Sequence, residues 1–186
     1  WGVCGGVVVV AGFARSPNFP TAPGAPDRQN ETYCYDRYTV YPCADAFVAR
    51  LSADGSALRW ATFIGGAADD HAQALAPAGG GRVALAGDTF SPDFPLTGDA
   101  YDRTGGIDRD AFLTVVGRGG GLDYSTYLGG QQAAGDGWFE GDRALAVHVA
   151  SDGRITVGGE TWSSDFPTTP GAYDRTRQGG YCLTAW

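Results

Sequence analysis

The sequence lacks several features that whole classes of protein need. It has no lysine and no methionine, and arginine supplies all 13 basic residues against 21 acidic ones, which gives a formal net charge of −8. Because nucleic-acid phosphates and anionic lipids are bound by clustered positive charge, this composition argues against nucleic acid and membrane surfaces as partners. Only 18% of the residues are charged and 12% are aromatic, which favours a packed globular core over disorder.

Long apolar stretches are also missing. The longest purely aliphatic run, Val7 to Ala11, is far shorter than the roughly 20 residues that a membrane-spanning helix requires, so we expect no membrane insertion. The chain begins at Trp1 instead of methionine, which we interpret as processing or truncation.

Cysteine and histidine are scarce: Cys4, Cys34, Cys43, Cys182, His71 and His148. No two cysteines form a Cys-x-x-Cys pair and the histidines lie far from them, so the spacing argues against a zinc site. Cys34 and Cys43 flank a tyrosine-rich stretch, YCYDRYTVYPC, that has the length of a small hairpin, and we predict a disulfide between them. A bridge from Cys4 to Cys34 or Cys43 is the alternative, and a bridge between Cys4 and Cys182 is not expected.

A glycosylation signal lies beside this stretch. Asn30 begins an Asn-Glu-Thr triplet, the acceptor pattern for an N-linked sugar. Together with the predicted disulfide it favours an extracellular or cell-surface location, with the sugar on Asn30 facing solvent.

Internal repetition is the strongest signal in the chain. GRVALAGDTFSPDFPLTGDAYDRT (81–104) aligns with GRITVGGETWSSDFPTTPGAYDRT (153–176), and a weaker copy occupies 6–28. A second unit recurs as DAFVARLSADGSALRWATFIGG (45–66) and DAFLTVVGRGGGLDYSTYLGG (110–130). Repeats of this length indicate a fold built from one supersecondary unit used several times.

Each unit contains strand hairpins. The segment ALAVHVA is followed by a Ser151-Asp152-Gly153 turn and RITVGGETW, and DAFVARL is followed by an Ala53-Asp54-Gly55 turn and LRWATFIGG. We therefore predict an all-β fold of four antiparallel strands per repeat, with 81–89 and 153–161 as second strands and the Asp-Ala-Phe segments as third strands. This is the plan of a β-propeller blade.

The pattern DAFVARLSADGSALRWATFIGG, with ALAVHVASDGRITVGGETWSSDFPTTPGAYDR, resembles the bacterial-type SBBP β-propeller repeat family over nearly the whole chain. The resemblance implies a propeller fold, and the family as a whole has no single activity to carry over. We divide the chain into blade one (1–66, with an insertion at 29–44), blade two (72–130), an inserted loop (131–142) and an incomplete blade three (144–186). These amount to about 2.75 blades, and because closed propellers take 4–8 we expect a fragment of a larger propeller, or copies that complete a ring.

The most repeated motif is Asp-Phe-Pro, at 93–95 and 165–167, with Asn-Phe-Pro at 18–20. The architectural interpretation is that Asp or Asn caps a turn, Pro sets φ and Phe fills the gap between blades. The alternative is an aromatic that stacks on carbohydrate in every blade. Sameness in every repeat favours architecture, since a site needs asymmetry.

The Tyr-Asp-Arg triplets at 101–103 and 173–175 also recur between repeats, which again favours an architectural role. We expect an Asp–Arg pair that fixes the entry to the third strand, with a catalytic constellation as the alternative. No Gly-x-Ser-x-Gly elbow occurs, and no motif gives either histidine a serine or cysteine partner, so we predict no catalytic residue.

The inserted loop GDGWFEGD carries Asp136, Glu140 and Asp142. Oxygen ligands on a glycine-rich loop are those that Ca²⁺ prefers, but the spacing does not fit an EF-hand. We treat these three acids as a weak calcium site, with a solvated acidic loop as the alternative, and predict no other metal or cofactor.

The two insertions are the predicted contact surfaces, because inserted positions vary without disturbing a repeat scaffold. They carry amphipathic aromatics of the kind that dominate interface cores: Tyr33, Tyr35, Tyr38, Tyr41, Trp138 and Phe139. The prediction is a non-enzymatic structural or assembly module whose partners are other chains of an extracellular complex or appendage, or the remaining blades of the same chain. The alternatives are a glycan- or protein-binding module and a fragment of a propeller hydrolase or lyase.

Overall fold

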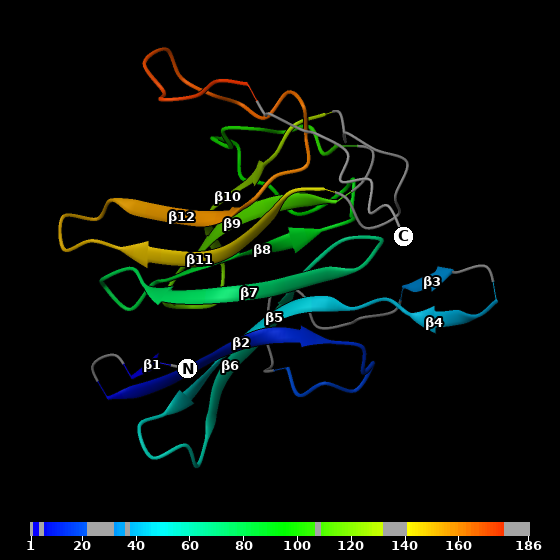
Figure 1. The fold of residues 1–186 in the computed structure, drawn as a ribbon. Helices are drawn as coiled ribbons and strands as arrows, with labels where there is room; N and C mark the ends of the chain where they lie inside the picture. The colour runs from blue at the N-terminus through cyan, green and yellow to red at the C-terminus, as the bar shows by residue number, and fades with distance from the viewer. Residues whose placement is uncertain are drawn as a thin grey trace, which may run out of the picture.

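The protein is built from antiparallel strands. The computed structural model describes residues 2–3, 6–21, 32–35, 38–106, 109–131 and 141–176. These residues form twelve strands and no helix (Figure 1). No helix that could cross a membrane is therefore present in this part of the chain.

The first sheet has four strands in the order β1-β2-β5-β6, and every neighbouring pair is antiparallel. Its bounds are β1 (Gly2–Val3), β2 (Val7–Ala14), β5 (Asp45–Ser52) and β6 (Leu58–Ile64). Gly55 makes the predicted β5–β6 turn with φ of 72°, a value that favours glycine. Hydrogen bonds from the Ser52 hydroxyl and from Ser56 to the Asp54 carboxylate close this turn and lower the pKa of Asp54 to about 2.

The second sheet repeats the first. Its order is β10-β9-β8-β7, again antiparallel throughout. The bounds are β7 (Asp70–Pro77), β8 (Val83–Thr89), β9 (Asp110–Val116) and β10 (Leu122–Leu128). In both sheets the Phe of the Asp-Ala-Phe strand lies opposite a glycine on the neighbouring strand. Phe47 lies opposite Gly12 in the first sheet, and Phe112 lies opposite Gly87 in the second.

Two further hairpins complete the described chain. β11 (Arg143–Val149) pairs with β12 (Ile155–Glu160), and the predicted turn at Gly153 has φ of 88°. β3 (Tyr33–Tyr35) pairs with β4 (Val40–Pro42), lies between β2 and β5 in the chain and stands to one side of the sheets (Figure 1). A disulfide joins Cys34 to Cys43 across this hairpin, which confirms the predicted pairing.

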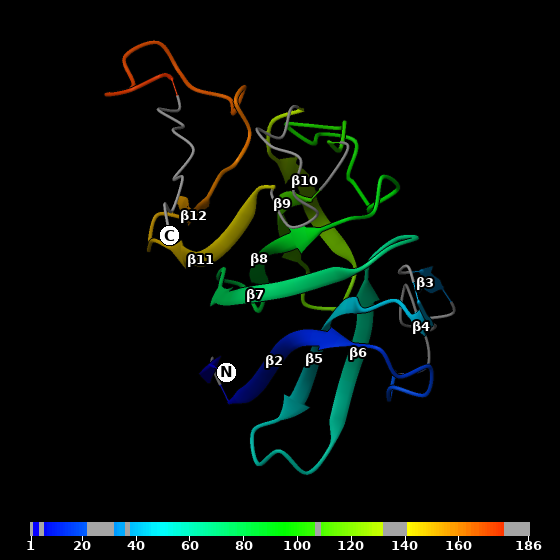
Figure 2. The same ribbon diagram turned by 45° about the vertical axis from the view of Figure 1, so that its right-hand side comes forward.

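The strands of successive repeats lie next to one another. In both ribbon views β7 runs between β2 and β11 (Figure 1 and Figure 2), and β7 packs against both. A single apolar cluster joins the two four-stranded sheets: Val9, Ala46, Val48, Ile64, Val83, Leu85, Phe94, Phe112, Val116 and Tyr127. The other face of the second sheet packs on β11–β12 through Ala84, Val115 and Val147.

The predicted all-β fold is confirmed, as are the positions of 81–89 and 153–161 as second strands and of the Asp-Ala-Phe segments at 45 and 110 as third strands. Each residue of 142–176 is the equivalent of the one 72 positions earlier, so β11–β12 corresponds to β7–β8. The cysteines at positions 4 and 182 lie outside the described residues.

Candidate functional site

A buried carboxylate marks the junction between the two large sheets. Asp70, at the start of β7, is fully buried, and its Oδ2 accepts hydrogen bonds from the Gly66 amide and the Ser91 hydroxyl, each at 2.8 Å. Burial raises the pKa of Asp70 to about 6, against the opposing effect of the hydrogen bonds it accepts. A β-carbon on Gly65 would lie 2.6 Å from Asp45 Oδ1 and 2.8 Å from Asp70 Oδ2, so this approach needs glycine.

The same arrangement recurs one repeat later. The Asp142 carboxylate is fully buried and accepts hydrogen bonds from the Gly130 amide and the Ser163 hydroxyl, each at 2.7 Å. A β-carbon on Gly129 would collide with Asp110 and Asp142. Asp142, which the sequence grouped with a weak calcium site, is therefore the equivalent of Asp70 and belongs to the junction.

The Asp of the Asp-Phe-Pro motif is tied to the same junction. Asp93 Oδ1 accepts a hydrogen bond from the Ala67 amide at 2.8 Å, and Asp165 Oδ2 accepts one from the Gln131 amide at 3.2 Å. We expected this side chain to cap its own turn, but its partner lies in the connection that follows the preceding sheet. The carboxylate therefore joins two units of the repeat.

The Phe of the same motif packs on aromatic side chains of its own sheet in the first two units. The ring of Phe94 lies 4.7 Å from Phe112 and 6.0 Å from Tyr127 between ring centroids, and Phe19 lies 4.4 Å from Phe47 in the first sheet. Burial raises the pKa of Tyr127 to about 12. Phe94 is 3% exposed, whereas Phe166, its equivalent in the third unit, is 37% exposed.

The Tyr-Asp-Arg triplet does not form the predicted ion pair. The Asp102 carboxylate instead accepts hydrogen bonds from the amide and hydroxyl of Thr104, both at 2.9 Å, and Arg103 donates to the Thr97 carbonyl at 2.7 Å. Asp174 binds Thr176 in the same way. Neighbouring side chains on this loop point to separate backbone partners, because each closes a local turn.

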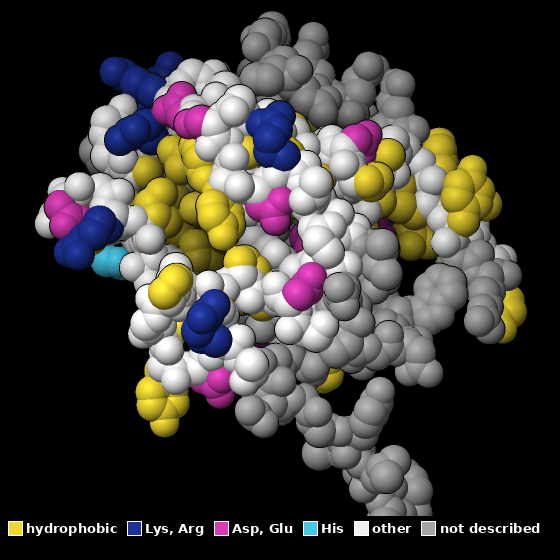
Figure 3. Space-filling view, turned by 90° about the horizontal axis from the view of Figure 1, so that it is seen from above, with side chains coloured by type: hydrophobic (Ala, Val, Ile, Leu, Met, Phe, Trp, Pro, Cys, Tyr) yellow, Lys and Arg dark blue, Asp and Glu magenta, His cyan; other side chains and the backbone are white. Residues whose placement is uncertain are grey.

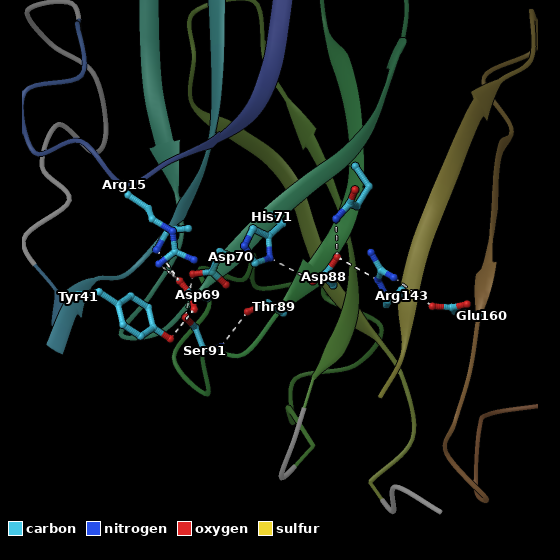
Figure 4. Close-up of polar contacts among 12 residues, drawn as sticks. Arg15, Tyr41, Asp69, Asp70, His71, Asp88, Thr89, Ser91, Arg143 and Glu160 are labelled. Carbon is cyan, nitrogen blue, oxygen red and sulfur yellow. Dashed lines mark hydrogen bonds and ion pairs between the residues drawn. The ribbon is translucent and has the colours of Figure 1, made fainter. Parts of the chain in front are cut away.

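A polar network that the sequence did not predict surrounds Asp88. Figure 4 shows His71 and Arg143 approaching this carboxylate from β7 and β11: His71 Nδ1 lies 3.2 Å from Oδ2, and Arg143 Nε lies 3.6 Å from Oδ1. Gln73 donates to Oδ1 at 2.9 Å, and Arg143 also pairs with Glu160 at 3.3 Å.

The groups around Asp88 keep its carboxylate ionised. Burial by itself raises the pKa of Asp88, but hydrogen bonds from His71 and Gln73 and the charge of Arg109 outweigh it, so the pKa is lowered. The other side of the His71 ring meets Phe13 edge-on at 4.6 Å. No local motif could have revealed these contacts, because Phe13, Asp88 and Glu160 occupy equivalent positions with different residues.

The tyrosine hairpin, formed by β3 and β4, has an anchored side and an exposed side. Tyr41 donates to Asp69 Oδ2 at 3.3 Å, and Arg15 lies over the Tyr41 ring at 4.9 Å while pairing with Asp69 at 3.2 Å (Figure 4). Tyr33, Tyr35 and Tyr38 are exposed. Of the four predicted contact tyrosines, the structure thus places three on the surface and one at the base of the hairpin.

Several predicted residues lie outside the described residues: Asn30, Asp136, Trp138, Phe139 and Glu140. Within the described ranges, no group of three or more His, Cys, Asp or Glu side chains is arranged to hold a metal ion.

No protein-family model matches the chain, and no curated protein matches it significantly. The resemblance to SBBP-type repeats therefore stands on the motifs of the sequence alone.

Proposed function

We propose that this chain is a non-enzymatic structural or assembly module of an extracellular or cell-surface complex, built from SBBP-type β-propeller blades. The observation that carries the proposal is the tyrosine hairpin, which presents three exposed aromatic side chains. The residues that recur in each repeat instead bond to and pack on one another in the core and at the junctions between sheets.

The hairpin is held in place for such a contact. The disulfide closes it, and the Ala44 amide donates to Asp69 Oδ1 at 2.7 Å at its base. Arg15 adds a hydrogen bond to the Pro42 carbonyl at 3.0 Å. Because the disulfide and these hydrogen bonds already restrain the hairpin, a partner that covers the exposed rings gains about 25 cal/mol per Å² of apolar surface and loses less entropy than on binding an untethered loop.

The propeller assignment draws on the repetition of the sheets. Two four-stranded antiparallel sheets of the same strand order pack through one core, and β11–β12 adds the first two strands of a third unit. A propeller stacks blades in this manner around an axis, with 4–8 of them on closure. The disulfide supports the extracellular location, since such bonds persist in oxidising compartments.

A glycan is the second candidate partner, and one feature of the hairpin favours it. Tyr33 and Tyr35 lie two residues apart on β3 and are both exposed, so their side chains point to the same face of the strand. Two neighbouring aromatic rings form a surface on which sugar rings stack.

The test compares the wild-type chain with the triple variant Tyr33→Ser, Tyr35→Ser and Tyr38→Ser. Both are used as bait in the extracellular fraction of the source organism, on a glycan array, and alone in sedimentation equilibrium. Tyr173→Ser is the matched control, because Tyr173 is an exposed tyrosine on the loop that follows β12 and is not part of the hairpin.

We expect the triple variant to keep its far-ultraviolet circular dichroism and its disulfide but to lose the association that the wild type and the control share. Loss of protein association supports assembly, and loss restricted to the array supports the glycan. Identical association by all three proteins would overturn the proposal.

A further inference from the structure

Strand β12 lies at the edge of a two-stranded sheet, whereas the two large sheets of the described chain have four strands each. Among the described residues it pairs with β11 on one side only, whereas its equivalent, β8, pairs with β7 and with β9. A strand edge of this kind presents unpaired backbone groups that another strand can bind. The two complete sheets show which strand belongs there.

In both complete sheets the added strand places a phenylalanine ring over a glycine. Ring atoms of Phe47 lie 3.3 Å from the position of a β-carbon on Gly12, and ring atoms of Phe112 lie 2.9 Å from that of Gly87. Gly159 is the third member of this series. A glycine inside a strand weakens it and often marks a close approach by another group.

The backbone is a second reason for glycine at two of the three positions. A β-carbon on Gly87 would collide with the His71 carbonyl, and one on Gly159 would collide with the Arg143 carbonyl. At Gly12, however, the atoms of the described residues that would lie within 4 Å of such a β-carbon belong to the Phe47 ring. The contact between the Phe ring and the glycine therefore recurs in the repeat even where the backbone does not require glycine.

Among the described residues, the Phe of the third unit has no aromatic neighbour of the kind that its two equivalents have. Phe94 packs against Phe112 and Tyr127 of the two added strands, and Phe19 packs against Phe47 and Phe63 in the same manner. Phe166 is the equivalent of Phe94 and Phe19, yet it is exposed. Its ring needs a strand pair of the β9–β10 type for the same burial.

The surface beside β12 is apolar. Ile155 and Val157 of β12 are only partly buried, and they contact the apolar clusters that also contain Val147. Seen from above, hydrophobic side chains gather in a hollow on this side of the molecule (Figure 3).

We propose that the β12 edge is an acceptor site for a donated β-hairpin of the β9–β10 type. The first donated strand runs antiparallel to β12, with Asp-Ala-Phe in the register of the second sheet, so that the Phe lies opposite Gly159 and the Ala opposite Glu160. The second donated strand brings an aromatic ring to Phe166.

The donor is a repeat unit other than those that form the described sheets. A second copy of these sheets is a poor donor, because its β5–β6 and β9–β10 hairpins are already paired within their own sheets.

The first test uses a labelled synthetic peptide with the sequence of residues 109–130, added to the full chain and followed by fluorescence anisotropy. We expect saturable one-to-one binding that falls about tenfold or more when the peptide's Phe112 is replaced by alanine. Phe166→Ala in the chain should weaken binding similarly, whereas Tyr173→Ala, an exposed position on the same loop, should not.

A tethered version removes dependence on peptide solubility. The 109–130 sequence is joined through a Gly-Ser linker to the end of the full chain, and hydrogen exchange of β12 amides is measured with and without the Phe-to-Ala change. Slower exchange of β12 amides that requires the Phe supports the proposal. The proposal is overturned if the alanine form binds or protects β12 equally well, or if neither form does. It is also overturned if the chain self-associates and the peptide does not compete with that self-association.

Discussion

The hydroxyl of Tyr127 donates a hydrogen bond to the backbone carbonyl of Ser91 at 2.7 Å, and the same oxygen accepts one from the Phe94 amide at 3.1 Å. These bonds tie the outermost strand of the second sheet, β10, to the Asp-Phe-Pro turn that follows β8. The turn is thus joined both to β10 and to the preceding unit, since the Asp93 carboxylate accepts a hydrogen bond from the Ala67 amide. The motif is part of the framework of the sheet and its junction.

Replacing Tyr127 by phenylalanine should reduce the free energy of unfolding by about 1 kcal/mol, because the Ser91 carbonyl and the Phe94 amide each lose one buried hydrogen bond and keep only the 3.2 Å bond between them. Phe63 occupies the equivalent position in the first sheet, so the ring itself fits. Urea unfolding measures the change, with exposed Tyr173→Phe as the control. Equal stability of the two variants would show that the hydroxyl is not part of the framework.

Removing the disulfide with Cys34→Ala and Cys43→Ala should lower the free energy of unfolding by about 2–3 kcal/mol, because the closed loop is short and restricts the unfolded chain only modestly. The large sheets should persist, since neither cysteine lies in them. The hairpin itself stays anchored by Arg15, Asp69 and Tyr41. Urea unfolding and limited proteolysis check this. Global unfolding of the variant at neutral pH would contradict it.

Stability should fall as the pH rises from about 4 to about 7. The folded-state pKa of Asp70 is about 6 against an ordinary value of 3.8. A raised pKa contributes stability that is fully present below the unfolded value and is lost as the pH passes the folded one, by roughly 3 kcal/mol here. The lowered pKa of Asp88 acts in the opposite direction and only at more acidic pH.

Asp70→Asn isolates this effect, because it keeps the shape of the side chain without the charge. Urea unfolding at pH 4.5 and pH 7 should show a smaller fall in stability for the variant than for the wild type. The same fall in both proteins would mean that Asp70 does not cause it.

The sequence predicts well those features that depend on neighbours in the chain. The hairpins turn at Gly55 and Gly153 with positive φ, as the Asp-Gly pairs indicate, and Cys34 bonds to Cys43 across a short hairpin. The order of strands follows from the spacing of the repeat. In each case one or two local preferences point to the same structure.

Contacts between distant residues were less accessible. Asp142 looked like one of three loop acids, although aligning it with Asp70 would have predicted its burial. Tyr41 lies at the base of the hairpin, where its hydroxyl bonds to Asp69, a residue 28 positions further along the chain. The Asp88 network joins residues that differ from repeat to repeat, so repetition gave no signal for it.

The Asp-Phe-Pro motif belongs to the framework of the sheets, and its Phe in two different surroundings tests this role. Phe94 is buried among Phe112 and Tyr127, whereas Phe166 is more than a third exposed in an otherwise equivalent loop. Equilibrium urea unfolding of Phe94→Ala and Phe166→Ala is the most direct measurement. We predict a loss of about 3–5 kcal/mol for Phe94→Ala and less than about 1 kcal/mol for Phe166→Ala. Equal losses, or a Phe94→Ala variant as stable as the wild type, would contradict the account.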